Sequence, residues 1–201
     1  MISQQKTAIM GVYCIDRAVS LMSIFRELNK LTIQAINNGH CGIFTASDLS
    51  MMLNREDNKA FRAILTKSVS NDTLKRITKG IYVNAHLPPN PKGAIYIIAK
   101  QLRWKSFNYV SLESQLSHLG VISQIPMGYL SVMTKGRSGH FITDYGTIEF
   151  THTNRDISLL EDGVYFDDEI GMFRANKERA IADLKRVGRN INMIEEIDDV
   201  G

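Results

Sequence analysis

The chain has 201 residues, of which 44% are hydrophobic and 22% are charged, as in soluble globular proteins with room for one large domain or two small ones. Its two cysteines, Cys14 and Cys41, are too few and too far apart to predict a disulfide framework or a zinc site. No segment approaches the roughly 20 apolar residues that cross a bilayer, and the first residues lack the pattern of a secretory signal. We therefore expect a cytoplasmic protein with no membrane partner.

A long helix is predicted from Asp16 to about Asn38, because apolar residues recur every two to four positions and Gly39 is a suitable C-cap. Residues 1–15 are weakly patterned and receive no assignment. We expect this helix to support the elements that follow it, to form a dimer contact, or to do both.

Two short helices are predicted next. Thr45 or Ser47 can cap the first, and Asp57 or Asn58 can cap the second, which runs over about residues 59–69. The second helix is expected to bury its apolar residues, which recur at helical spacing: Phe61, Ile64, Leu65 and Val69.

A β-hairpin is predicted after the second helix. Two short β-rich runs, residues 74–77 and 81–83, flank the turn residues Lys79 and Gly80. The order helix, turn, helix and hairpin predicts a winged helix-turn-helix, whose second helix enters the DNA major groove while the hairpin meets the backbone.

Basic residues are concentrated in this motif. From Arg55 to Val83 there are seven Lys or Arg against three acidic residues, a net charge of +4, whereas the whole chain carries only +3. A phosphate-binding surface needs such local positive charge. The predicted DNA-binding residues are Asn58, Lys59, Arg62, Lys67, Lys75, Arg76 and Lys79. Two other interpretations stay open, a solvated basic face and a protein–protein module.

These basic residues are expected to play different parts. A guanidinium can bond a guanine edge twice, so Arg62 is the best candidate for reading a base. Lys75, Arg76 and Lys79 are expected to contact phosphates, which position a protein without reading sequence.

A proline-rich segment marks a domain boundary. Three of the four prolines lie within residues 87–93, so we predict a first domain over 1–86, a linker over 87–93 and a second domain over 94–201. The second domain is expected to contain helices near 94–104, 112–119 and 176–187, β-hairpins between 128 and 153, and a strand near 163–166. The predicted fold class is α+β: a winged helix-turn-helix followed by a mixed α/β domain and an acidic tail.

Three phrases in a fixed order resemble the AbiEi family of antitoxins, which regulate transcription of bacterial AbiE toxin–antitoxin operons. They are ITKGIYVN at 77–84, YVSLESQLSHLGVI at 109–122 and ANKERAIADL at 175–184. Within them, SLESQL (111–116) is similar to a Ser-x-Glu-Ser-Ala-Leu phrase of the family, and ERAIAD (178–183) to a Glu-Arg-Ala-x-x-Asp phrase. The resemblance covers roughly residues 40 to 190, and Gln115 departs from it where alanine is more usual.

The resemblance implies two activities. The first domain would bind inverted repeats of double-stranded DNA in its own promoter, with two copies on the DNA, and the second would neutralise a nucleotidyltransferase-like toxin. The residues that it implies for a polar antitoxin surface are Glu113, Ser114, Arg179 and Asp183. From spacing alone, Arg179 and Asp183 can instead form an ordinary ion pair one helical turn apart.

Nothing in the sequence predicts an enzyme, a metal site or a cofactor. The acidic residues Asp144, Glu149 and 167–169 lack the lysine of a Glu-x-Lys nuclease pattern, and the histidines lack metal-binding spacing. Two alternatives remain beside the antitoxin hypothesis. One is a winged-helix regulator whose second domain senses a ligand or dimerises, and the other is a DNA-processing enzyme that a winged helix targets to DNA.

Overall fold

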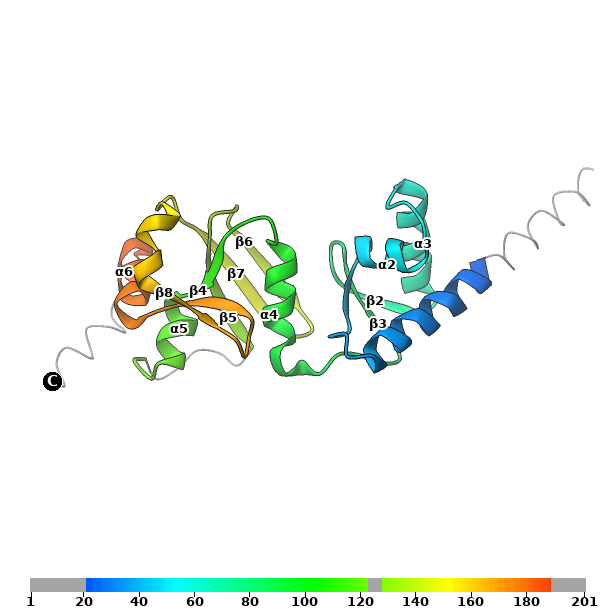
Figure 1. The fold of residues 1–201 in the computed structure, drawn as a ribbon, viewed down its shortest axis with the longest axis horizontal. Helices are drawn as coiled ribbons and strands as arrows, with labels where there is room; N and C mark the ends of the chain where they lie inside the picture. The colour runs from blue at the N-terminus through cyan, green and yellow to red at the C-terminus, as the bar shows by residue number, and fades with distance from the viewer. Residues whose placement is uncertain (1–20, 123–127, 189–201) are drawn as a thin grey trace, which may run out of the picture. The chain divides into compact units, whose positions relative to one another are not determined.

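The computed structural model describes residues 21–122 and 128–188 (Figure 1). The chain divides into two compact units, one ending at Pro89 and the other beginning at Asn90. Each unit contains helices and its own β-sheet, so the α+β class is confirmed. Residues 1–15 and the acidic tail lie outside the described residues. None of the described helices is long and apolar enough to cross a membrane.

The first unit combines helices with a three-stranded sheet. Residues 21–37 are helical, and the chain then turns through Gly39, which has a positive φ of 93°. The elements that follow are β1 (Ile43–Thr45), α2 (Ala46–Met52), α3 (Lys59–Ser70), β2 (Leu74–Thr78) and β3 (Ile81–Asn84). The strands pair antiparallel in the order β1-β3-β2, with a register shift between Arg76 and Thr78.

Side-chain caps fix the starts of both short helices. The hydroxyl of Thr45 accepts from the Asp48 amide (3.1 Å), and the Asp48 carboxylate accepts from the Thr45 amide (2.7 Å), which forms a capping box at α2. Of the two residues that could cap α3, Asn58 does so, because its side-chain oxygen accepts from the Phe61 amide (3.0 Å).

One apolar cluster holds the first unit together. It joins the helix at 21–37 and helices α2 and α3 to the sheet through Ile24, Leu28, Phe44, Ala46, Leu49, Phe61, Leu65, Leu74 and Tyr82. A polar contact adds to it, because the buried Asn84 of β3 donates to Asn29 (2.9 Å) and Thr32 (2.8 Å). The helix at 21–37 therefore supports the two short helices, as predicted.

The second unit is built on a six-stranded sheet. Its strands, β4 (Asn108–Val110), β5 (Tyr129–Thr134), β6 (Gly139–Thr143), β7 (Gly146–His152), β8 (Val164–Asp167) and β9 (Met172–Ala175), lie in the order β6-β7-β5-β4-β9-β8. Its helices are α4 (Pro91–Leu102), α5 (Leu112–His118) and α6 (Lys177–Val187), with short 3-10 turns at Ile157–Leu159 and Glu161–Gly163.

Two details of this sheet differ from the sequence prediction. The hairpin between β6 and β7 is present, but β5 pairs with β7 in parallel, so β5 and β6 are not neighbours. Strand β9 was not predicted, although it lies between β4 and β8. Helix α4 starts at Pro91, within the predicted linker, but Lys92 and Gly93 have non-helical φ/ψ angles and the helix is regular only after Gly93.

The two faces of the sheet carry different helices. Tyr109 and Met133 are cross-strand partners and both belong to the cluster that includes Leu112, Leu116 and Leu184 of α5 and α6. Their neighbours along the strands point the other way, toward the face where α4 packs next to β7 (Figure 1).

We predict that Thr45→Ala lowers the free energy of unfolding by about 0.5–2 kcal/mol, because it removes the hydroxyl from the capping box of α2. Ser47→Ala is the matched control, since Ser47 is exposed and does not cap the helix; we expect a change within about 0.5 kcal/mol. Urea unfolding followed by circular dichroism measures both. Equal losses in the two variants would contradict the role given to the Thr45 hydroxyl.

Candidate functional site

Helix α3 separates its apolar and basic residues onto different faces. Phe61 and Leu65 are buried in the core of the first unit. Lys59, Arg62 and Lys67 are exposed. Arg62 lies three residues after Lys59 and Lys67 five residues after Arg62, so at 3.6 residues per turn the three side chains spread over roughly 140° of the helix circumference. The helix therefore presents three basic side chains on a face that its own core does not cover.

Asp57 holds the side chain of Arg62 at the start of this helix. Arg62 donates through Nε to Asp57 Oδ1 (2.7 Å) and through Nη2 to Asp57 Oδ2 (2.6 Å). The side chains of Arg62 and Asp57 are 49% and 26% exposed, so water screens the pair and its contribution to stability is about 0–1 kcal/mol. The pair fixes an orientation more than it stabilises the fold.

The pair leaves part of the guanidinium available. Arginine has five N–H groups, and Asp57 accepts from only two of them, which leaves both Nη1 hydrogens and one on Nη2. The hydrogen bonds to Asp57 raise the pKa of Arg62 above its usual value, and the charge of Asp57 and Tyr82 adds to this effect. Arg62 is thus a permanently charged, oriented donor.

The hairpin supplies the other basic side chains. Lys75 and Arg76 are exposed on β2, and Lys79 is exposed in the turn. Arg76 Nε donates to the Thr78 carbonyl (3.2 Å), and Gly80 takes a positive φ of 81° that closes the turn. The Gly80 carbonyl accepts from the Ala46 amide (3.0 Å), so the turn lies beside the start of α2.

All seven predicted DNA-binding residues lie in the first unit and are exposed. Six of them are basic, three on α3 and three on the β2–β3 hairpin, and we use the name basic surface for these six exposed side chains: Lys59, Arg62, Lys67, Lys75, Arg76 and Lys79. The seventh, Asn58, uses its side-chain oxygen to cap α3. The sequence predicts Asp57 only as a possible cap of α3, so its role beside Arg62 is apparent from the structure alone.

The residues predicted for a polar surface of the second unit do not form one. Glu113, Ser114 and Asp183 are all buried, and only Arg179 is partly exposed. Ser114 bonds within the fold, since its hydroxyl accepts from the Ser131 amide (2.7 Å) and its amide donates to the Ser131 hydroxyl (3.0 Å). This burial corrects the expectation of an exposed antitoxin surface at these positions.

Asp183 is the centre of a buried polar cluster. Its Oδ2 accepts from the Tyr109 hydroxyl (2.9 Å) and the Ser111 hydroxyl (2.9 Å), while no described residue bonds to its Oδ1. Burial raises the pKa of Asp183 above its usual value, although the two hydroxyls and the charges of Arg179 and Arg155 oppose this shift. Burial also raises the pKa of Tyr109, and the neighbouring Asp183 adds to the increase.

Arg179 acts on Asp183 through space, not as the direct ion pair that spacing permits. Its Nη2 donates to the Leu159 carbonyl (3.0 Å), and its Nε packs so close to Gly163 that a Cβ there would lie 2.6 Å away. Arg179 and Arg155 line a cavity of about 390 Å³ together with the acidic residues Asp162 and Glu178. The lining thus carries charges of both signs, and the Nε atoms of Arg155 and Arg179 are buried without a hydrogen-bond partner among the described residues.

Gln115, the departure from the AbiEi phrase, has a structural role. It is fully buried, and its side-chain oxygen accepts from Arg174 Nη1 (3.2 Å) while its amide nitrogen donates to the Tyr165 hydroxyl (3.3 Å). Arg174 also forms an ion pair with Asp167, which lowers the pKa of that carboxyl. The sequence signal for the cluster of Gln115, Asp167 and Arg174 is the single charged residue, Arg174, within the otherwise apolar segment 172–175; the sequence prediction did not use it.

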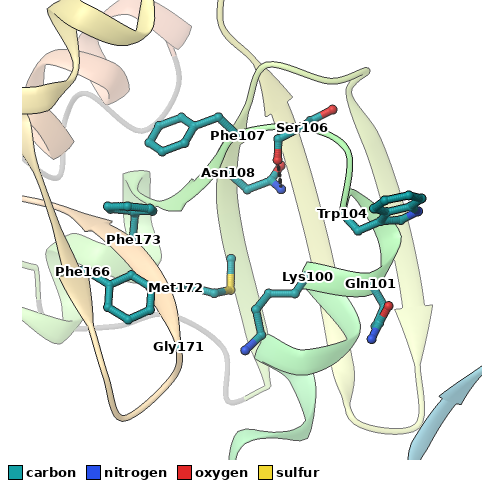
Figure 2. A pocket seen from close by; sticks show the side chains of 10 residues that line it. All are labelled: Lys100, Gln101, Trp104, Ser106, Phe107, Asn108, Phe166, Gly171, Met172 and Phe173. Carbon is teal, nitrogen blue, oxygen red and sulfur yellow. Dashed lines mark hydrogen bonds between the residues drawn. The ribbon is translucent and has the colours of Figure 1, made fainter.

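A second cavity, of about 400 Å³, lies between α4 and the β8–β9 hairpin (Figure 2). Its lining includes four aromatic residues that the sequence does not predict as site residues: Trp104, Phe107, Phe166 and Phe173.

No model of a known protein family and no curated protein matches the chain. The AbiEi resemblance therefore stays a prediction that depends on the three sequence phrases.

We predict that replacing Asp183 by Asn changes how stability depends on pH. Because the folded-state pKa of Asp183 is raised, the folded state keeps its proton to a higher pH than the unfolded chain does. The wild-type free energy of unfolding should thus fall, relative to Asp183→Asn, as pH rises from about 4, the unfolded pKa of aspartate, through the folded pKa.

Urea unfolding at a series of pH values measures this difference. Asp167, whose pKa is lowered in the folded state, gives a pH dependence of the opposite sign. Because it is present in both proteins, its contribution cancels in the difference between their free energies of unfolding. The control is Asp168→Asn, the same substitution at an exposed aspartate outside the buried cluster. A difference between wild type and Asp183→Asn that does not change with pH would contradict the prediction.

Proposed function

We propose that the chain is a DNA-binding autorepressor and the antitoxin of a bacterial toxin–antitoxin operon, and that its first unit is a winged helix-turn-helix. The observation that carries the proposal is the basic face of α3, which the core of the unit leaves exposed. Helix α2, the turn before α3, and the β2–β3 hairpin follow in the order of that motif. In this interpretation α3 enters the major groove and the hairpin lies along the backbone.

The orientation of Arg62 supports its role as the base-reading residue. The end of its guanidinium that Asp57 leaves available carries one N–H on each of two nitrogens, which is the arrangement that bonds guanine O6 and N7. Residues at the N-terminal end of a recognition helix are those that reach base edges, and Arg62 lies in the first turns of α3.

The antitoxin part of the proposal is supported by the way two of the family-like phrases meet. Ser111 belongs to SLESQL and Asp183 to ERAIAD, and the hydroxyl of the first donates to the carboxylate of the second. The two phrases thus contribute to one packed interface between α5 and α6, as expected of residues that determine the fold. A toxin would then contact other residues of the second unit, since those of the phrases are mostly buried.

Two copies are expected on the operator. A single winged helix covers limited DNA surface, and an inverted repeat offers each copy an equivalent half-site, with half-sites separated by multiples of about 10 bp when both lie on one face of the duplex.

We predict that Arg62→Ala weakens binding to the DNA upstream of the reading frame by about 1–3 kcal/mol and relaxes the preference at one base pair. Lys79→Ala should instead weaken binding to all sequences alike and reduce the slope of log affinity against log salt by about one. Fluorescence anisotropy with operator and scrambled duplexes, at several salt concentrations, separates the two effects.

Asp57→Asn is expected to change the affinity for scrambled DNA in the opposite direction in the same experiment. It removes a negative charge, so binding to scrambled DNA should strengthen, while the preference for the operator falls because Arg62 loses its support. If Arg62→Ala binds the operator as tightly as wild type at equal salt, α3 is not the reading helix.

We also predict that co-expression of the full-length chain restores growth of cells that express the neighbouring nucleotidyltransferase-like gene. The second unit alone, residues 90–201, should restore growth as well, because the basic surface lies wholly in the first unit. A matched Arg62→Ala full-length protein should rescue fully when expressed from an unrelated promoter. Rescue that depends on Arg62 would assign the effect to DNA binding and contradict a separate antitoxin unit.

A further inference from the structure

The cavity between α4 and the β8–β9 hairpin, which we call the aromatic cavity, has the size and lining of a small-molecule site. Its volume of about 400 Å³ falls within the range of about 300–1,000 Å³ that is usual for ligand pockets. In Figure 2 three phenylalanines stand on one side and Trp104 on the other, with Lys100, Asn108 and Met172 between them.

The phenylalanines form a continuous aromatic wall. The rings of Phe107 and Phe173 have centroids 5.1 Å apart, and Phe166 meets Phe173 edge-to-face at 5.3 Å. These contacts hold the rings in place, yet Phe166 remains 51% exposed and Trp104 73% exposed. Large aromatic side chains exposed on both sides of one hollow favour a ligand that removes their surface from water.

The polar side chains of the cavity determine the charge of that ligand. Among the described residues that line it, Lys100 alone carries a formal charge. Its Nζ donates to the Ile170 carbonyl (3.3 Å), which uses one of its three N–H groups. The nearby acidic residues Asp168 and Glu169 are exposed and do not belong to the lining.

A second cation lies next to one of the lining residues, Trp104. Lys105 Nζ is 4.9 Å from the centroid of the Trp104 ring. The side chain of Asn108 is already hydrogen-bonded within the fold. Its Nδ2 donates to the carbonyls of Arg103 and Ser106, and its Oδ1 accepts from the Thr134 hydroxyl. The other polar residues of the lining, Gln101 and Ser106, are neutral, so the charge of the described lining is that of Lys100 and is positive.

We propose that the aromatic cavity binds a small aromatic acid, whose ring lies against Phe166 and Trp104 and whose carboxylate accepts a hydrogen bond from Lys100. This goes beyond the proposed DNA-binding and antitoxin functions and does not depend on them. It gives the second unit a ligand of defined chemistry.

Trp104 makes the test direct, because it is the only tryptophan in the chain. Its fluorescence is followed while the full-length protein is titrated, at constant ionic strength, with phenylacetate, with its neutral analogue phenylacetamide, and with acetate, which lacks the ring. We expect a saturable change with phenylacetate, a weaker affinity for phenylacetamide, and no saturable change with acetate. Saturation-transfer NMR on the same samples detects binding that leaves the fluorescence unchanged.

Variants then assign the two parts of the site. Lys100→Met keeps the apolar stem of the side chain, and we expect it to weaken phenylacetate binding about tenfold or more while phenylacetamide binding stays the same, as for the loss of one charge-assisted hydrogen bond. Phe166→Ala should weaken both ring-containing ligands. The control is Lys177→Met, an exposed lysine of α6 outside the cavity, which should bind like wild type.

Three results would overturn the proposal, and the first two need no variant. They are the absence of saturable binding by any of the three compounds, equal affinity for phenylacetate and phenylacetamide, and unchanged phenylacetate affinity in a Lys100→Met protein with a wild-type circular dichroism spectrum.

Discussion

The burial of one side of α3 is the constraint on which the first unit depends. Phe61 and Leu65 pack against Phe44, Leu49, Leu74 and Tyr82, so the helix can rotate very little about its axis without losing apolar contacts. Once that side is buried, Lys59, Arg62 and Lys67 must face away from the core. The cap at Asn58 fixes where the helix begins, and Asp57 just before it fixes the direction of Arg62. A packing requirement thus becomes a defined arrangement of positive charge.

The second unit depends on buried polar contacts to a greater degree. Asp183 joins α6 to β4 and to the start of α5 through Tyr109 and Ser111, and Gln115 joins α5 to Arg174 of β9. Buried polar groups are costly unless they are paired, so such contacts favour one packing of the helices over others. These contacts explain why the SLESQL and ERAIAD segments contain polar residues at buried positions. Because these polar residues are buried, contact with other molecules would involve exposed parts of the unit, including the aromatic cavity.

Local patterns predicted the first unit well. The spacing of Phe61 and Leu65, the capping residues Thr45 and Asn58, and the Lys79–Gly80 turn each depend on neighbours within a few positions, and each was confirmed. Most of the failures concern distant partners; Asp57, which lies five positions before Arg62, is the local exception. Asp183 bonds a residue 74 positions away, and nothing near it in sequence distinguishes it from a surface aspartate. The parallel pairings of β5 with β7 and of β9 with β4 likewise join strands that are not adjacent in sequence. The basic side chains were predicted, whereas the partner that orients Arg62 was not.

The central claim is that the basic surface of the first unit binds duplex DNA. Backbone amide shifts of the full-length protein, recorded by NMR as DNA from upstream of its reading frame is added, test this claim most directly. The account predicts that the largest shifts fall in α3 and in the β2–β3 hairpin, and that the second unit changes little. Largest shifts within residues 90–188, or no shifts at a large excess of DNA, would contradict it.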